Sequence, residues 1–324
     1  MSDMNRDPAA GVPGDDGARR RRARRRRAEQ RGYLLYLLPG AVAFGAVIGY
    51  PLVTNVYFSL FEWRGGLSPL RWTGLGNYAE LLGDGDFWTS FGNSVAMVVA
   101  MVVVPTLIGL VLAAVLFDYL GRRFGARVAS VLRATYYLPQ ILPVAVAGVL
   151  WNWILNSQSG ALNAILRGAG IEDPPNWLGD PSTALPSVML VLIWVQIGYP
   201  VVIFMAALQR VDPELYEAAE LDGAGWSRRF RYITVPQIRP ETFVVTLTCT
   251  VAALKVFGPI YVLTRGGPES STLVPSYYSY LNFFDKSQVG YGAAVATVLT
   301  AVIVVVAVVI LALQARAERA EEIR

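Results

Sequence analysis

The residues best suited to chemistry lie in one polar internal stretch. It is residues 212–240, DPELYEAAELDGAGWSRRFRYITVPQIRP, between two long apolar runs. Within it, Glu217-Ala218-Ala219 is followed by Gly223 and then by Ile233-Thr234-Val235-Pro236. Two small alanines beside an acid let another protein surface approach closely and bind one charge, as when a helix lies in a partner's groove. The pattern therefore indicates the docking of a partner protein rather than catalysis.

The same stretch predicts two short helices joined by a glycine turn. Asp212 can cap the first helix, and Pro213 suits its first position, where the missing N–H is no loss. Gly223 and Gly225 interrupt the run of helix-forming residues. We expect the second helix to begin at about Ser227, with the two prolines further along limiting its extent.

A second interpretation of this stretch is an amphipathic connector on the membrane surface. Its arginines, Arg228, Arg229 and Arg231, would then pair with lipid headgroups. This accounts for the arginines, but it does not account for the spacing of the acid, the alanines, the glycine and the last proline. We therefore prefer docking.

The composition excludes several classes of catalytic site. The chain has no histidine, and its single cysteine, Cys249, lies within an apolar run. Histidine acid–base chemistry, cysteine-only metal sites and intrachain disulfides are therefore excluded. The only lysines, Lys255 and Lys286, do not follow a glycine, so there is no phosphate-binding loop of the G-x-x-x-x-G-K-[ST] type. We expect no catalytic residue, metal site or cofactor in this chain; if ATP drives it, another chain binds ATP and Mg²⁺.

The elements that hold the polar stretch are apolar enough to cross a bilayer. Mean hydropathy is +0.42 and only 16% of the residues are charged, and a membrane-spanning helix needs about 20 apolar residues. The sequence therefore predicts an all-α membrane protein with six transmembrane helices. We place these spans at residues 33–60, 92–117, 128–154, 185–208, 242–263 and 291–314.

Positive charge orients these spans. Ten arginines precede the first span, three lie at 118–127, five at 209–241 and three near the C-terminus, against five arginines and lysines in the loops of the opposite side. Because positive charge marks the cytoplasmic side, we expect both termini and the 209–241 loop inside the cell. The expected domains are a disordered Arg-rich tail at 1–31, a six-span domain at 32–318 and a cytoplasmic tail at 319–324.

The Arg-rich tail has two other interpretations. It could bind nucleic acid, but no groove-reading motif accompanies the charge, so we expect contact with anionic membrane lipid and no nucleic-acid partner. Ala41-Val42-Ala43 also matches the small-residue pattern of a secretory cleavage site. The apolar run continues well beyond it, so we expect an uncleaved anchor.

Lys255 is the only charged side chain away from the edges of the spans, and an intramembrane ionisable group is a functional candidate by default. The alternative is that its long stem only lets the ammonium reach a cavity or a subunit interface. No carboxylate lies in the middle of a span, so a carrier driven by an ion gradient is poorly supported. Aromatic faces and amides recognise sugars, but an interfacial belt better explains Trp151, Trp153 and the tyrosines of 277–280. The candidates for a solute path are Lys255 together with Trp194, Gln196, Tyr199 and Tyr261.

The spacing of the polar stretch resembles the EAA loop of ABC-importer permeases, E-A-A-x3-G-x9-I-x-L-P, with Val235 in place of the usual leucine. Further segments across residues 33–314 resemble the carbohydrate-uptake branch of that family, and are similar to the first of the two membrane subunits of maltose-type importers. The large extracytoplasmic insertion of the enteric maltose subunit has no counterpart here. The segments that carry this resemblance include Tyr50-Pro51, Gly76-Asn77-Tyr78, Trp151-Asn152-Trp153, Trp177-Leu178-Gly179-Asp180-Pro181 and Thr264-Arg265-Gly266-Gly267-Pro268.

The resemblance implies a type I, binding-protein-dependent ABC importer of the cell membrane, in which this chain is a multi-pass subunit and not an enzyme. The partners it implies are a second permease subunit, a dimer of ATP-binding subunits, an extracytoplasmic solute-binding protein and a sugar or oligosaccharide. A non-sugar solute, an ion-coupled secondary transporter and a non-transporting membrane scaffold remain alternatives. By resemblance, the residues that couple the chain to the ATPase are Glu217, Ala218, Ala219, Asp222, Gly223, Ile233 and Pro236.

Overall fold

The computed structural model describes residues 36–117 and 126–322. The chain divides into two units, Met1–Asn55 and Val56–Arg324, which are described separately. The tail expected to be disordered at 1–31 lies outside the described residues, as do the last two residues of the expected C-terminal tail.

The first unit holds most of one apolar helical span, Tyr36–Phe58. It includes a π-helical turn, η1 (Gly45–Gly49), and continues into α2 (Tyr50–Phe58). The Thr54 hydroxyl donates to the carbonyl of Tyr50, 2.8 Å away, which satisfies a polar group inside the span. The first predicted span, 33–60, is confirmed over its described residues, and α2 ends two residues earlier than expected.

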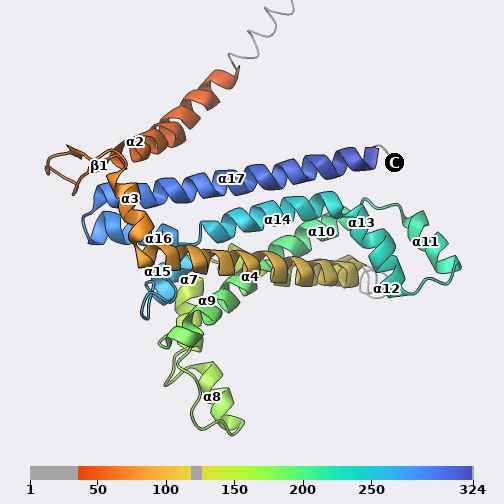
Figure 1. Ribbon diagram of the computed structural model, residues 1–324. Coiled ribbons are helices and arrows are strands. Elements are labelled where there is room, and N and C mark those ends of the chain that lie inside the picture. Colours follow the sequence, from red (N-terminus) through yellow and green to blue (C-terminus); the bar gives the residue numbers. More distant parts are fainter. Residues whose placement is uncertain (1–35, 118–125, 323–324) are drawn as a thin grey trace, which may run out of the picture. The chain divides into compact units, whose positions relative to one another are not determined.

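The second unit contains the other long apolar helices (Figure 1). Those that correspond to predicted spans confirm them, and the helices extend beyond the predicted limits at one or both ends. Over the described residues, five helices are long and apolar enough to cross a membrane, or six if one bent pair counts as a span. The helices that make up these spans are α4 (Gly85–Val115), α6 (Ala126–Ile141), α7 (Val144–Ile154), α9 (Pro181–Gln196), α10 (Gly198–Leu208), α14 (Arg239–Leu254), α15 (Gly258–Leu263) and α17 (Val289–Glu322).

The third predicted span, 128–154, is present but broken at Pro143, one of the interior prolines at which the spans are expected to kink. Its two halves, Val131–Ile141 and Val144–Ile154, are bent by 94° relative to each other. Pro143 precedes α7 with an extended backbone, φ −55° and ψ 134°. Proline has no N–H to continue the helix, and it disfavours the helical conformation at the residue before it. Hydropathy alone does not show this break, because it does not depend on backbone direction, whereas the proline does predict it.

Helix α4 packs along α9, α10 and α14, and α10 also packs against α6. Two glycines permit these close crossings. A Cβ on Gly109 would lie 2.6 Å from the Cβ of Pro200, and one on Gly198 would lie 2.4 Å from the carbonyl oxygen of Tyr136. The core where α4, α10 and α14 meet is lined by Ala113, Leu116, Val201, Phe204, Met205, Ala207, Leu208, Ile238, Val245 and Cys249.

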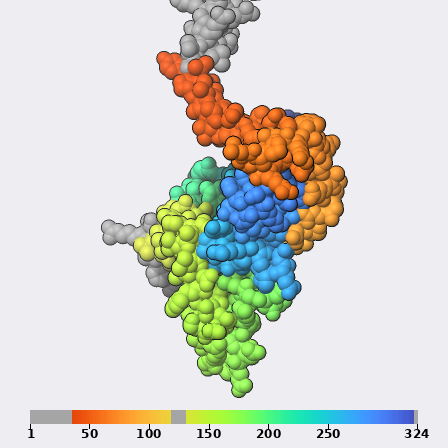
Figure 2. Space-filling model, turned by 90° about the vertical axis from the view of Figure 1, so that its left-hand side faces the viewer, coloured from red at the N-terminus to blue at the C-terminus, as the bar shows by residue number. Residues whose placement is uncertain are grey.

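Shorter elements lie at the end of this bundle away from the polar stretch 212–240 (Figure 1). They are a two-stranded antiparallel sheet, β1 (Phe61–Glu62) with β2 (Arg71–Trp72), and the helices α3 (Gly76–Gly83), α8 (Ala161–Gly168), α16 (Pro275–Tyr280) and η4 (Leu281–Asp285). Helix α3 contacts α17, and α16 contacts both α4 and α17. Figure 2 shows this arrangement as blue atoms of α16 and α17 lying against orange atoms of α3 and α4.

Asp84 joins several of these elements. Its carboxylate caps α4 by accepting from the backbone N–H groups of Asp86 and Phe87, and it also accepts from the hydroxyls of Tyr278 and Tyr291. Burial alone would raise the pKa of the Asp84 carboxyl, but these hydrogen bonds outweigh burial and hold its pKa below the ordinary value. Burial, together with the hydrogen bond to the Asp84 carboxylate, raises the pKa of Tyr278 to about 12. The ionised acid therefore fixes the start of α4 to α16 and α17.

Candidate functional site

The first helix of the polar stretch is α11 (Pro213–Leu221), and it begins as the sequence predicts. The Asp212 carboxylate accepts from the Glu214 backbone N–H at 3.0 Å, and Pro213 occupies the first helical turn. At the other end, the Gly223 N–H donates to the Glu220 carbonyl at 3.0 Å, while the next N–H along the chain reaches back to the Ala219 carbonyl at 2.9 Å. This pair of bonds is a Schellman motif, which places Gly223 in the left-handed region with φ +73°.

The second half of the stretch is a series of short helical segments. They are α12 (Trp226–Arg229), the π-helical turn η3 (Phe230–Thr234) and α13 (Val235–Gln237). The helix thus starts one residue before the predicted Ser227. Pro236 lies inside α13 rather than ending the segment, because a proline is tolerated in a first helical turn. The break falls at Ile238, and Pro240 then lies in the first turn of α14.

Two side-chain contacts hold the halves of the stretch together. The buried hydroxyl of Tyr216 on α11 lies 3.1 Å from the Thr234 hydroxyl on η3. The Arg229 guanidinium donates to the Glu220 carboxylate at 2.9 Å. Glu220 is mostly exposed, so this ion pair contributes little to stability. The buried Tyr216 is the stronger tie, and it makes the loop a folded unit.

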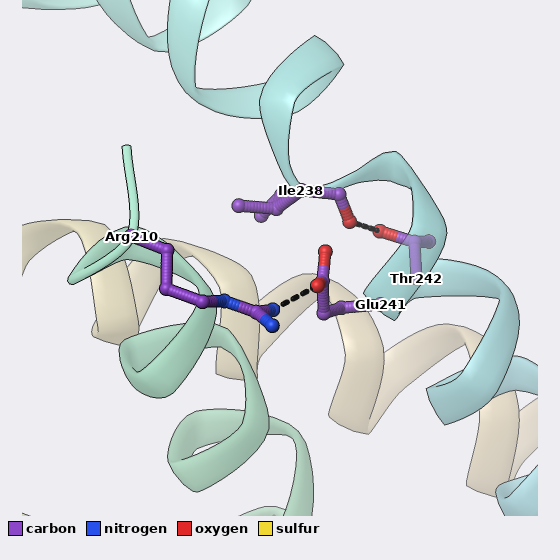
Figure 3. Close-up of polar contacts among 4 residues, drawn as sticks. All are labelled: Arg210, Ile238, Glu241 and Thr242. Atoms are coloured by element: carbon purple, nitrogen blue, oxygen red, sulfur yellow. Dashed lines mark hydrogen bonds and ion pairs between the residues drawn. The ribbon is translucent and has the colours of Figure 1, made fainter. Parts of the chain in front are cut away.

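The two ends of the loop lie next to each other, and we call this part the base of the loop (Figure 3). Arg210, just after α10, donates to the carboxylate of Glu241 in the first turn of α14. Ile238 is fully buried in the core shared by α4, α10 and α14. The Thr242 hydroxyl donates to the Ile238 carbonyl at 3.0 Å. Both ends of the loop are therefore fixed to neighbouring spans.

The far side of the loop presents a mixed surface to solvent. Among the residues expected to couple, Glu217, Ala218, Asp222, Gly223 and Pro236 are exposed, while Ala219 and Ile233 are partly buried. Beside them, Leu221 is 91% exposed and Tyr232 is 70% exposed. Exposed leucine and tyrosine beside an acid and small side chains suit a protein interface. Sequence reasoning missed Leu221 and Tyr232, although their places in a polar stretch were a usable signal.

The residues expected along a solute path do not form one cluster. Gln196 is 7% exposed, and its amide donates to the Sγ of Cys249 at 3.2 Å. The Tyr199 hydroxyl donates to the Thr248 hydroxyl at 3.2 Å, so both side chains meet α14. The Trp194 ring meets Trp151 edge-on, with 5.4 Å between ring centroids. Tyr261 instead joins an aromatic cluster with Phe257, Tyr277 and Tyr280.

Lys255 lies apart from those four residues, in an open hollow of about 460 Å³. It follows the last residue of α14, where the span breaks before α15. The other residues lining the hollow come from α16 and α17: Ser276, Ser279, Ala296, Leu299, Thr300, Ile303 and Val304. The sequence reading did not include these hydroxyl residues, because nothing in the spacing along the chain brings α16 and α17 beside Lys255.

Comparison with known families decides what this arrangement belongs to. Residues 106–320, which include the whole loop, match the family described as binding-protein-dependent transport system inner membrane component. The chain belongs to this family. Like other members, this permease is a multi-pass inner-membrane component of a transport system and not an enzyme.

The permease is also similar to individual relatives. It is 37% identical over 266 residues to the probable ABC transporter permease protein YurN of Bacillus subtilis, an alignment that covers 82% of this chain and 89% of the relative. It is 32% identical to the diacetylchitobiose uptake system permease protein NgcF of Streptomyces coelicolor, covering 89% of this chain and 83% of that one. The permease therefore belongs among the ABC transporter permeases.

A solved structure shares the fold of the permease. It is a crystal structure of a bacterial alginate ABC transporter in complex with an alginate pentasaccharide-bound periplasmic protein. A chain of that assembly superposes with a TM-score of 0.76 at 21% sequence identity, covering 88% of this chain and 94% of that chain. The predicted type I ABC-importer permease architecture is thus confirmed.

Proposed function

We propose that this permease forms half of the solute pathway of an ABC importer for a sugar or oligosaccharide, and that α11 is the docking site of a separate ATPase. The relative named for diacetylchitobiose uptake and the fold shared with an alginate transporter support a carbohydrate solute. The partners are a second permease, a pair of ATPase subunits that bind ATP and Mg²⁺, and an extracytoplasmic solute-binding protein. The excess of arginines in the termini and in the loop supports a cytoplasmic position for all three.

The single observation that carries the coupling role is the construction of the loop. Its exposed surface holds Glu217 and Leu221, while its base is held by buried Ile238 and by the contact between Arg210 and Glu241. A force applied to α11 reaches α10 and α14 through this base. A partner shifts a conformational equilibrium only through contacts that differ between the two states. The exposed face of α11 is where the ATPase makes such contacts.

The substitution Glu217→Lys tests the coupling role. It reverses one exposed charge at the proposed interface, and like charges facing each other across an interface cost several kcal/mol. We expect ATP-driven solute uptake to fall about tenfold or more, and the ATPase to co-purify less with the permease. The amount of permease inserted in the membrane should stay unchanged, because the Glu217 side chain is exposed.

The matched control is Glu80→Lys. Glu80 is also exposed on a short helix, α3, which contacts α17 at the end of the bundle away from the loop. This variant should import solute at the wild-type rate. Wild-type uptake and normal ATPase association in the Glu217→Lys variant would refute docking at α11.

A further inference from the structure

Lys255, which lines the hollow, lies inside an apolar span and not at either end of that span. Lys255 belongs to the span Arg239–Leu263 and follows its longer helix, α14. Its backbone N–H still bonds to the carbonyls of Val251 and Ala252, both at 3.2 Å, so the helix is intact up to that residue. The chain then turns before α15, and the turn leaves the Lys255 side chain exposed at the hollow.

The charge of Lys255 has no counter-ion among the described residues. The Lys255 ammonium makes no hydrogen bond or ion pair with any of them, and no acid lines the hollow. The acids of the described spans, Asp86, Glu241 and Glu318, belong to the first or last turns. An ammonium away from bulk water is costly unless an anion pairs with it. The hollow is therefore electrostatically suited to a negative group.

The hydroxyls of the hollow are arranged as acceptors. The Ser279 hydroxyl donates to the carbonyl of Gly292 at 2.8 Å, and the Thr300 hydroxyl donates to that of Ala296 at 2.8 Å. The Ser276 hydroxyl likewise donates to the carbonyl of Val256. A hydroxyl whose hydrogen is already used still has lone pairs that accept. The wall thus offers three acceptor oxygens beside one cation with three N–H donors.

We propose that this hollow binds an anionic sugar, with the solute's carboxylate, sulfonate or phosphate group paired to Lys255. The solute's own hydroxyls donate to the oxygens of Ser276, Ser279 and Thr300. The remaining wall, of alanine, leucine, isoleucine and valine, suits the C–H face of a sugar ring. A neutral sugar would fill the same space but leave the ammonium unpaired. This inference rests on the proposed role in carbohydrate import and narrows its substrate class.

The experiment uses the complete transporter, with its second permease, ATPase and binding protein, reconstituted in liposomes. The probes are pairs of labelled disaccharides that differ only in having a glucuronate or a glucose at one end. We expect the wild type to import a uronate member. Lys255→Met should lower the initial uptake rate of the uronate about tenfold or more, because the solute's anionic group would then enter the site without a partner charge. Lys255→Arg keeps the charge and should retain most of that uptake.

The chain's other lysine provides the matched control. Lys286 is exposed after η4, and its ammonium lies 5.4 Å from the centre of the Tyr278 ring, outside the hollow. Lys286→Met should import the uronate at the wild-type rate. The comparison shows whether uronate import depends on the positive charge at Lys255 in particular or on the total positive charge of the chain.

Three results would overturn the proposal while leaving carbohydrate import standing. The first is import of only the neutral members by the wild type. The second is normal uronate import by the Lys255→Met variant. The third is an equal loss of neutral and uronate import in this variant. The last result, together with loss of the second permease on size-exclusion chromatography, would show that Lys255 forms an ion pair with a carboxylate of that subunit instead. A wild-type complex that imports none of the sugars would contradict the proposed function itself, and the anionic-sugar inference with it.

Discussion

Gly223 is required by the backbone and not by the space around it. Its φ is +73°, whereas a Cβ built there would meet no atom within 4 Å. Side-chain-bearing residues are strained in this region, because their Cβ approaches the following carbonyl oxygen. The sequence predicted a turn at this position from the glycine alone. The sequence alone did not explain the spacing, which follows because the second residue after α11 must close a Schellman motif.

Gly223→Ala should therefore weaken the end of α11 by roughly 1–2 kcal/mol. We expect the ATPase activity of the assembled transporter to depend less on solute-loaded binding protein, because the docking helix frays. Gly225→Ala is the control, since Gly225 has an ordinary φ of −65° and open space around it. Equal solute stimulation in the two variants would show that the left-handed turn has no part in coupling.

Other single residues were less predictable. Lys255 was recognisable as an unusual charge in an apolar span, but the hydroxyls beside it come from helices distant in sequence. Gln196 and Tyr199 were chosen for their chemistry, and the structure has both donating to α14. Residue type suggests what a side chain can bind, whereas its actual neighbours depend on how helices cross.

At the scale of elements, apolar runs predicted the approximate limits of the spans, and their number agrees if the bent pair α6 and α7 counts as one. They did not give the break between α6 and α7, which depends on one proline and on a 94° change of direction. They also did not identify which glycines lie at helix crossings. That property depends on the distance between two backbones, and no pattern within a single helix determines it.

Gly198→Ala tests one such crossing. Its Cβ would lie 2.4 Å from the Tyr136 carbonyl oxygen and 2.7 Å from the Tyr137 Cα, so α6 and α10 would have to move apart. Overpacking of this kind costs roughly 1–3 kcal/mol. We expect a lower thermal unfolding temperature for the purified permease, measured by loss of the monodisperse peak after heating.

Gly92→Ala serves as the comparison. Gly92 lies in α4, and a Cβ there would meet nothing within 4 Å. Alanine is also a better helix former than glycine, so this variant should be as stable as the wild type or more so. Unfolding temperatures that fall equally in both variants would rule out the close crossing of α6 and α10 as the cause.

At the scale of the whole molecule, the bundle of the second unit has a different kind of structure at each end. One end carries the loop built on α11, and the other carries α3, α16 and the acid-capped start of α4 (Figure 1). The distribution of arginines predicts that the loop end faces the cytoplasm. The segment that contains α8 should then face outward.

This orientation can be tested with cysteines, because the only native one, Cys249, is fully buried. In intact cells, a membrane-impermeant maleimide should label the Glu172→Cys variant and leave the Ser227→Cys variant unlabelled. Both positions are exposed in the structure, and opening the cells should make Ser227→Cys reactive. The reverse labelling pattern would invert the assigned topology and remove α11 from the side where ATP is available.

The contact between Arg210 and Glu241 has an evolutionary consequence. Because the loop leaves and re-enters the bundle at neighbouring points, its exposed residues can diverge without displacing the helices around Lys255. If the loop binds the ATPase and the hollow binds the solute, as we propose, these two binding surfaces are free to change independently. Related permeases with this arrangement can then change the transported solute while keeping the same ATPase, or change the ATPase while keeping the same solute.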